Sequence, residues 1–449
     1  MDFVEKCRTI IGFDTTPGQS NKPLIEWLQG LAQQSGLFAE IQPGLTSSGS
    51  EQANIIIRPQ AGRPDSEFLL QSHLDTVDPG PFQMWKQNEF NPFDATIEDG
   101  KIYGLGAAET KLDFLCKLEA LSRVSHHKEW KLPPVLVGTY GEESGMTGAM
   151  KLIRKNVLTP RIALIAEPTD MKLVYAAKGF ASVEIRVPFS DDEMEYRLEH
   201  NLRESTTTQS KLFFGKSAHS SVPHLGESAI LKMFDYLEKM PDSVVIMEID
   251  GGTNFNTVPA NAMIEMDIQS VRNPISLKLK KVLSLIQKIE SQFRAIHDPE
   301  FTPSHPTLNI GMIRTLEDHV LLSGSCRIPP VVTQQTYMNW MEFLKSECEK
   351  VGVDFRVSDY KRPFRTAENS FFLRGGLDVL RSFGLSDKAI TQPSTNESSL
   401  FARIGADCLC FGPGSREGNV HTPHEHVKIK DLELAVEVYV SMIERFSLV

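Results

Sequence analysis

The sequence predicts an α/β protein whose main domain is interrupted by a smaller α+β domain. Short apolar runs that end in polar, Gly or Pro residues recur at 53–59, 68–73, 134–140, 161–168 and 406–412. Amphipathic helical stretches separate them, which is typical of a mostly parallel central sheet. The length of 449 residues exceeds the ~100–200 residues of one ordinary domain, so a second domain is expected.

The main domain is expected to be discontinuous. Helical spacing of apolar residues predicts helices at 22–35, 112–124 and 431–446, on both sides of the middle part of the chain. The return of α/β character from about residue 363 places the C-terminal helix with the N-terminal segments. We therefore assign residues 1–179 and 363–449 to one domain.

The pattern changes after Gly179. FASVEIRV (180–187) alternates apolar and polar residues, and strand-like pieces follow at 244–249 and 262–268, between helical stretches at 228–240 and 277–293. Half-polar alternation suits an antiparallel sheet with one face in water. Residues 180–362 are therefore expected to form a separate α+β domain.

Composition excludes several classes of partner. With 47 Lys and Arg against 58 Asp and Glu, the net charge of −11 disfavours nucleic-acid binding. No apolar run reaches the ~18–20 residues needed to span a bilayer, and Asp2 and Glu5 at the start do not suit a secretory signal. The six cysteines contain no CxxC pair, which favours reduced thiols of a cytoplasmic protein.

Candidate metal ligands lie just beyond the apolar runs, where open α/β sheets bind ligands. Imidazoles and carboxylates of this kind favour zinc, manganese or cobalt over a thiolate site. Each candidate residue, taken alone, has an ordinary explanation, such as a place in a charged loop or an acid favoured by a helix dipole. Their joint occurrence at separate strand ends is the informative signal. The candidates are His73, Asp75, Glu109, Glu142, Glu143, Glu167 and His421, with His424 and His426 as alternatives to His421.

Seven segments in fixed order resemble the dinuclear zinc aminoacylase and carboxypeptidase family, which includes acetylornithine deacetylase, succinyl-diaminopimelate desuccinylase and glutamate carboxypeptidase. The resemblance covers nearly the whole chain. It implies a zinc-binding catalytic domain and a lid domain that usually dimerises, here 180–362. The segments are SHLDTVDPG (72–80), IYGLGAAETK (102–111), GTYGEESGMTGA (138–149), AEPTDMKLVYAAKG (166–179), GKSAHSSVPHLGESAI (215–230), GGTNFNTVP (251–259) and FGPGSREGNVHTPHEHV (411–427).

The resemblance implies two divalent metal ions around one shared water. His73 and Glu167 would hold one zinc, and Glu143 and His421 the other, with Glu109 bridging them. Asp75 would fix the tautomer of His73 through a hydrogen bond. Glu142 would be the general base, since neighbouring residues on an extended segment point in opposite directions.

The resemblance also assigns residues in the lid. His219 matches a histidine that reaches the active site of the partner subunit in a homodimer, where it stabilises the oxyanion. Asn256 matches an asparagine that helps to hold the substrate.

Three positions in two segments depart from the family pattern. Glu109 and Leu112 stand where Asp and Gly are usual, and the peptide bond after Glu109 is expected to be cis. Gln269 stands where an arginine usually clamps a substrate carboxylate. Arg327, in GSCRIPP, is the candidate replacement, with a plain surface arginine as the alternative interpretation.

These observations favour a cytoplasmic, metal-dependent amide hydrolase that removes an acyl group from a small N-acyl amino acid, as acetylornithine deacetylase does. Glu397 in STNESSLF and the segment PTLNIG (306–311) resemble that subgroup. The alternatives are a dipeptidase or carboxypeptidase of the same family, and a relative that binds a ligand without hydrolysis.

Overall fold

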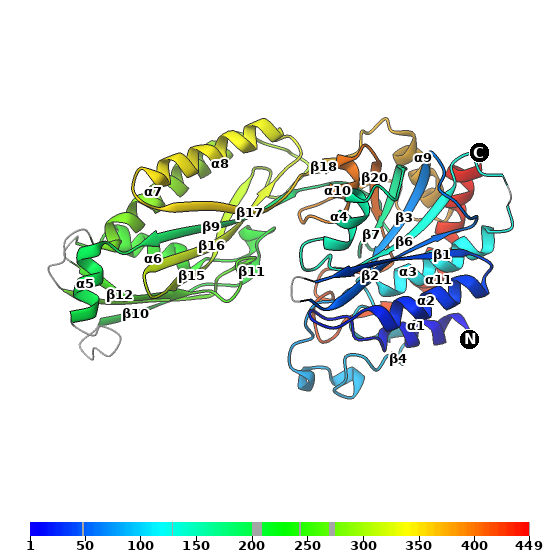
Figure 1. Ribbon diagram of the computed structural model, residues 1–449, viewed down its shortest axis with the longest axis horizontal. Helices are drawn as coiled ribbons and strands as arrows, with labels where there is room; N and C mark the ends of the chain where they lie inside the picture. Colours follow the sequence, from blue (N-terminus) through cyan, green and yellow to red (C-terminus); the bar gives the residue numbers. More distant parts are fainter. Residues whose placement is uncertain (47–48, 128, 200–208, 242–243, 269–273, 449) are drawn as a thin grey trace. The chain divides into compact units, whose positions relative to one another are not determined.

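The computed structural model describes residues 1–46, 49–127, 129–199, 209–241, 244–268 and 274–448 (Figure 1). The chain forms two compact units. Unit 1 comprises Met1–Ala176, Phe364–Thr391 and Asn396–Val449, and unit 2 comprises Ala177–Pro363 and Gln392–Thr395. No helix among the described residues is both long and apolar enough to cross a bilayer.

Unit 1 is built on a nine-stranded mixed sheet, which confirms the α/β prediction. The four central strands, in the order β6, β3, β7, β20, are mutually parallel and fully or largely buried. Antiparallel strands flank them: β2 pairs with β6 and β1 with β2 on one side, and β8 pairs with β20 on the other. The strands are β1 (Phe38–Leu45), β2 (Glu51–Arg58), β3 (Glu67–His73), β6 (Pro134–Thr139), β7 (Pro160–Ala166), β8 (Val174–Ala177), β18 (Phe364–Arg365), β19 (Ile390–Gln392) and β20 (Asp407–Phe411).

Helices cover both faces of this sheet (Figure 1). Helix α3 packs on α11 and on β3, while α10 packs on α4, β7 and β20. A small separate sheet of β4 (Thr96–Glu98), β5 (Lys101–Tyr103) and β21 (His426–Lys428) ties the segment before α3 to the C-terminal segment. The helices are α1 (Phe3–Ile11), α2 (Lys22–Gln34), α3 (Lys111–Val124), α4 (Thr147–Arg154), α9 (Phe371–Ser382), α10 (Ser398–Arg403) and α11 (Ile429–Ile443).

Unit 2 contains a seven-stranded antiparallel sheet in the order β10-β14-β12-β15-β16-β9-β17. This is the α+β arrangement that the alternating pattern after Gly179 predicts. The strands are β9 (Gly179–Pro188), β10 (Gln209–Phe214), β12 (Val244–Gly251), β14 (Asn261–Ile268), β15 (Thr307–Thr315), β16 (His319–Ile328) and β17 (Asp354–Lys361). The short strands β11 (Ala218–His219) and β13 (Thr257–Val258) pair beside them.

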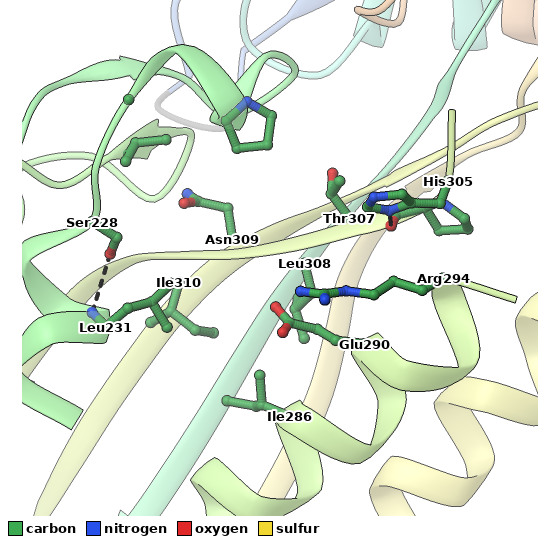
Figure 2. A pocket seen from close by; sticks show the side chains of 14 residues that line it. Ser228, Leu231, Ile286, Glu290, Arg294, His305, Thr307, Leu308, Asn309 and Ile310 are labelled. Atoms are coloured by element: carbon green, nitrogen blue, oxygen red, sulfur yellow. Dashed lines mark hydrogen bonds between the residues drawn. The ribbon is translucent and has the colours of Figure 1, made fainter. Parts of the chain in front are cut away.

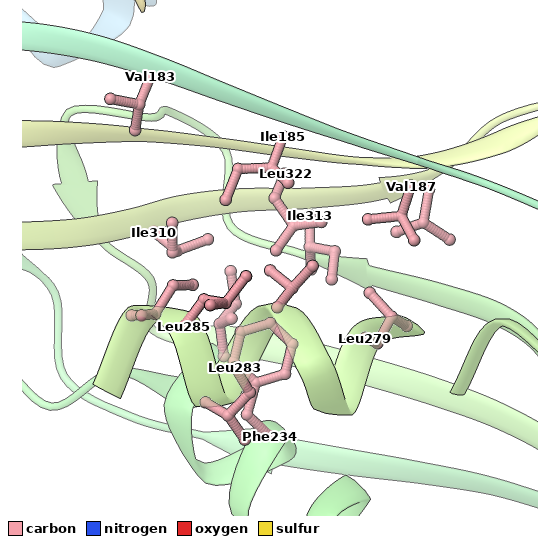
Figure 3. Close-up of a cluster of buried hydrophobic side chains, with 14 of the residues drawn as sticks. Val183, Ile185, Val187, Phe234, Leu279, Leu283, Leu285, Ile310, Ile313 and Leu322 are labelled. Atoms are coloured by element: carbon pink, nitrogen blue, oxygen red, sulfur yellow. The ribbon is translucent and has the colours of Figure 1, made fainter. Parts of the chain in front are cut away.

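One hydrophobic core holds unit 2 together (Figure 3). In β9, residues 181, 183, 185 and 187 are buried while their neighbours are more exposed, so one face of the sheet is apolar. Helices α6 and α7 pack on this sheet and on each other, and α8 packs on α7 and β17. The helices are α5 (Asp191–Glu199), α6 (Ala229–Glu238), α7 (Ile275–Phe293) and α8 (Gln334–Glu349).

Candidate active site

The parallel strands of unit 1 place the candidate ligands at one edge of the sheet. His73 is the last residue of β3, the Glu142–Glu143 pair follows β6, and Glu167 directly follows β7. Parallel strands end at the same edge, so side chains from distant parts of the chain meet there. Glu109 enters this edge just before α3, with a cis peptide bond to Thr110 as expected.

The first group of possible ligands consists of Glu109, Glu143 and His421. One donor atom from each lies within 4.8 Å of the other two. Nε2 of His421 is 2.9 Å from Oε2 of Glu109 and 2.9 Å from Oε1 of Glu143. Three oxygen and nitrogen donors in this arrangement fit a divalent ion such as zinc.

The second group consists of His73, Glu142 and Glu143, again with donor atoms within 4.8 Å. It differs from the set implied by the resemblance, which pairs His73 with Glu167 and leaves Glu142 as a base. Nδ1 of His73 is 3.1 Å from the carbonyl oxygen of Asp75. An ion would therefore bind Nε2, because Nδ1 faces this carbonyl oxygen.

Arg416 occupies the space between two of the expected ligands. Its Nη2 atom is 2.9 Å from Oε1 of Glu109 and 2.5 Å from Oε2 of Glu167. Arg416 stands in the segment FGPGSREGNVH, five positions before His421, but its residue type gave no sign of a role at the site. The first group thus fits an ion as it stands, whereas the carboxylates of Glu109 and Glu167 already share a guanidinium.

Asp75 fixes the position of the two glutamates that follow β6. Its Oδ1 accepts a hydrogen bond from the backbone N–H of Glu142 at 3.1 Å, and its Oδ2 accepts one from that of Glu143 at 3.0 Å. The Asp75 carboxylate is 3.6 Å from Nδ1 of His73, beyond hydrogen-bond distance. The carboxylate of Asp75 therefore orients the acidic pair directly, and its carbonyl oxygen faces the histidine.

Glu425 is a second residue at the site that the sequence pattern did not predict. Its Oε1 atom accepts the backbone N–H groups of Ala108 at 2.9 Å and Glu109 at 3.1 Å. Burial raises the pKa of Glu425 to about 7. Its spacing, four residues after His421, was the only available signal. Glu425 thus holds the backbone that presents Glu109.

Charge interactions shift the pKa values of the buried groups strongly. Burial opposes ionisation of Glu109, but Arg416 and His421 outweigh it and lower the pKa of Glu109 to about 2. Burial disfavours the charged form of His421, yet Glu109 and Glu143 raise its pKa to about 11. Burial raises the pKa of Glu142 well above its usual range, with a partial offset from His73. Perturbed groups of this kind cluster at functional sites.

The lid residues singled out by sequence form one cluster in unit 2. Nδ2 of Asn256 lies 3.3 Å from Nε2 of His219, and Nη2 of Arg327 donates to Oδ1 of Asn256 at 2.7 Å. Arg327 is only 3% exposed and stacks on Phe180, so the surface-arginine interpretation is wrong. Gln269 lies outside the described residues.

A separate cavity of about 220 Å³ lies in unit 2, between α7 and β15 (Figure 2). Its lining includes Glu290, Arg294 and His305, and none of the candidate site residues. It is smaller than the ~300–1,000 Å³ of typical ligand pockets. This cavity is therefore separate from the candidate metal ligands and from the His219 cluster.

Comparison with known proteins points to one family. The sequence matches peptidase family M20/M25/M40 over residues 69–445. Acetylornithine deacetylase from Myxococcus xanthus is 24% identical over 446 residues, covering 94% of this chain and 92% of the relative. The acetylornithine deacetylase from Pasteurella multocida is 28% identical over 320 residues, covering 65% and 74%.

Solved structures show the same fold. The M20 family metallo-carboxypeptidase Sso-CP2 from Sulfolobus solfataricus has a TM-score of 0.64 at 17% identity and covers 99% of both chains. Aminoacylhistidine dipeptidase from Vibrio alginolyticus has a TM-score of 0.64 at 17% identity, covering 99% of this chain and 96% of its own. The chain therefore belongs to peptidase family M20/M25/M40 and is a metallohydrolase that acts on amide bonds.

Proposed function

We propose that this metallohydrolase removes the acyl group from N-acyl amino acids. The observation that carries the proposal is the ligand group of Glu109, Glu143 and His421, with the Glu142 carboxyl beside it at the sheet edge. Four relatives with 24–30% identity are acetylornithine deacetylases, which supports an N-acyl substrate over a peptide.

The candidate residues at the sheet edge of unit 1 have distinct parts in this reaction. A divalent ion held by Glu109, Glu143 and His421 would lower the pKa of water and polarise the scissile carbonyl. Glu142 takes a proton from the attacking water and gives it to the leaving amine. Asp75 keeps Glu142 in place through the backbone N–H groups it accepts. Zinc is the proposed metal, ahead of cobalt and manganese, and a second ion stays a prediction from the resemblance.

The lid cluster supplies substrate recognition in this proposal. The Arg327 guanidinium and Asn256 would bind the carboxylate of the amino acid, because a buried arginine next to an amide is a strong and geometrically specific carboxylate partner. His219 is exposed and would donate to the oxyanion in the partner subunit of a homodimer. The cytoplasmic location stays a prediction from the sequence.

The test is a substrate screen coupled to one catalytic variant. Purified protein with added zinc is assayed against N-acetyl and N-succinyl amino acids and against dipeptides. Glu142→Gln should lower kcat by about 10²–10⁴-fold with little change in KM, because it removes the proton-transfer group but keeps the shape. Glu417→Gln, an exposed change in the same unit, is the matched control.

Each result of the screen is decisive. Faster hydrolysis of dipeptides than of N-acyl amino acids would replace the deacylase by the peptidase alternative. Zinc binding without hydrolysis of any substrate would support the ligand-binding relative. Full activity of Glu142→Gln would remove the assignment of Glu142 as the base.

A further inference from the structure

Arg416 contacts two carboxylates, Glu109 and Glu167, that the family resemblance implies as metal ligands. A single atom, Nη2, contacts carboxylates that come from two segments far apart in sequence, Glu109 at 2.9 Å and Glu167 at 2.5 Å. Both carboxylates are largely buried, at 7% and 4% exposure. Buried carboxylates need a cation nearby, and here the guanidinium supplies that charge.

A metal ion and this guanidinium cannot share the position. Zinc bound by two carboxylates sits ~2.0–2.2 Å from each oxygen, and the space between these oxygens is filled by Nη2. Arginine has no lone pair to offer a metal and keeps its proton at any ordinary pH. Binding of an ion by Oε1 of Glu109 together with Glu167 would therefore require Arg416 to leave.

The loop that carries Arg416 is built against the segments it contacts. A Cβ at Gly414 would lie 2.5 Å from the carbonyl oxygen of Ala108, and one at Gly412 would lie 2.5 Å from that of Glu167. The close approach of this loop thus requires glycine at both positions. The side chain of Asn419 closes the loop with hydrogen bonds to the backbone of Ser415 and His426. Arg416 is therefore held near both carboxylates by its backbone.

The length of Glu109 is consistent with this arrangement. Its two carboxylate oxygens serve different partners: Oε2 faces His421 at 2.9 Å and Oε1 faces Arg416 at 2.9 Å. Glu109 thus contacts His421 with one carboxylate oxygen and the Arg416 guanidinium with the other.

We propose that Arg416 takes the place of one of two metal ions, so that this chain holds a single divalent ion at Glu109, Glu143 and His421. The group of His73, Glu142 and Glu143 shares Glu143 with this site, and Glu142 serves as the base, so this second group holds no ion of its own. The guanidinium provides the fixed positive charge between Glu109 and Glu167. Arg416 acts as a positioning residue, since it orients Glu109 toward the ion. This inference rests on the proposed function only in assuming that the site takes a metal.

Metal content gives the direct test. The protein is loaded with excess zinc, and unbound ion is removed by gel filtration. Inductively coupled plasma mass spectrometry should then find about one zinc per chain. Arg416→Gln should raise the ratio to about two, because Glu109, Glu167 and His73 are then available to a second ion. Arg374→Gln, an exposed arginine of unit 1, should leave the ratio at about one.

Manganese provides a second measurement that does not depend on activity. Electron paramagnetic resonance of Mn²⁺-loaded wild-type protein should show isolated ions, and Arg416→Gln should show exchange-coupled pairs. Circular dichroism of the variant checks that it folds, and Arg416→Lys, which keeps a cation there, should stay at about one ion per chain.

The outcomes separate this inference from the proposed deacylase. Two zinc ions in the wild type, or one in Arg416→Gln that is folded, would overturn the role of Arg416 even if the enzyme hydrolyses N-acyl amino acids. A single ion in wild type and two in the variant would support it even if the substrate proves to be a peptide. No bound metal in the wild type overturns the inference and also the metal site of the proposed function.

Discussion

Asp75 shows how one buried side chain can organise several catalytic groups. Its carboxylate accepts two consecutive backbone N–H groups, and its carbonyl oxygen faces His73. Hydrogen bonds between a carboxylate and N–H groups are among the stronger ones in proteins. A residue of this kind affects rate through geometry, without touching the substrate.

Asp75→Ala is expected to lower kcat/KM by about 10–100-fold, the range seen when groups that orient metal ligands are removed. The segment with Glu142 and Glu143 loses both of its side-chain acceptors, so the base and one ligand shift together. Steady-state kinetics on the N-acyl substrate would measure it. Asp78→Ala, an exposed change three residues away, is the control, and equal kinetics for the two variants would contradict the prediction.

Lys178 is a buried cation of unit 2 with a depressed pKa. Burial, together with the positive charge of Arg327, lowers the pKa of Lys178 from 10.5 to about 8. Below pH 8 both the folded and the unfolded chain carry the proton, so the full cost of burying the charge is present. Between pH 8 and 10.5 only the unfolded chain keeps it, and the stability of the folded chain should rise with pH.

The pH dependence can be isolated with Lys178→Met. The difference in free energy of unfolding between variant and wild type should change by up to about 3 kcal/mol in favour of the wild type from pH 7 to 10.5. Urea denaturation at several pH values would measure it. Lys172→Met, an exposed lysine, should give a flat difference, and a flat difference for Lys178→Met would show that its pKa is ordinary.

At the scale of secondary structure, a buried ion pair fixes α3 beneath β3. Nζ of Lys117 is 2.8 Å from Oδ2 of Asp113 and donates to the carbonyl oxygen of Gln71 at 2.6 Å. Tyr439 of α11 donates to the same aspartate. Because β3 ends at His73, this network sets the position of the strand that presents a candidate ligand.

Lys117→Met should destabilise the fold by about 3–5 kcal/mol, because it leaves the Asp113 carboxylate buried without its cation. The double variant Lys117→Met/Asp113→Asn should lose less stability than Lys117→Met alone, because Asp113→Asn removes the buried carboxylate charge that has lost its partner. Lys6→Met, which breaks the half-exposed pair with Glu119, should cost less than about 1 kcal/mol. A double variant that is less stable than Lys117→Met would contradict this role of the ion pair.

The sequence predicts elements well where apolar residues form a continuous buried run, as in β3, or recur at helical spacing, as in α7. Strand β3 was expected at 68–73 and spans 67–73, and α7 was expected at 277–293 and spans 275–293. Helix α5 was missed because its residues are mostly charged and its main buried polar contact is the Glu193–Arg197 pair. Such a helix has no apolar stripe for a pattern to detect.

At the candidate site, the sequence could predict only residues whose type commonly binds metals. His73, Glu143 and His421 are of residue types that bind metals, so the sequence could offer them as candidates, and their donor atoms lie in the two possible ligand groups. Arg416 and Glu425 act through contacts with residues about 250–320 positions away: arginine is not a ligand type, and Glu425 accepts backbone N–H groups. Sequence pattern alone carries no information on such long-range contacts.

At the scale of the whole molecule, unit 2 has its own core and is almost one continuous segment. Residues 177–363 expressed alone are expected to fold, because a domain with its own hydrophobic core can fold independently. Thermal unfolding followed by circular dichroism should show one cooperative transition whose midpoint does not change with added zinc. A fragment without a cooperative transition would show that unit 2 depends on the rest of the chain.

The parallel pairing of β20 with β7 has a consequence for synthesis on the ribosome. His421 and Arg416 follow β20, so they emerge from the ribosome after all the segments of unit 2. A nascent chain already exposes Glu109, Glu142, Glu143 and Glu167 with no counter-charge from that last segment. The growing protein thus lacks these two cations at the acidic sheet edge until the segment after β20 leaves the exit tunnel.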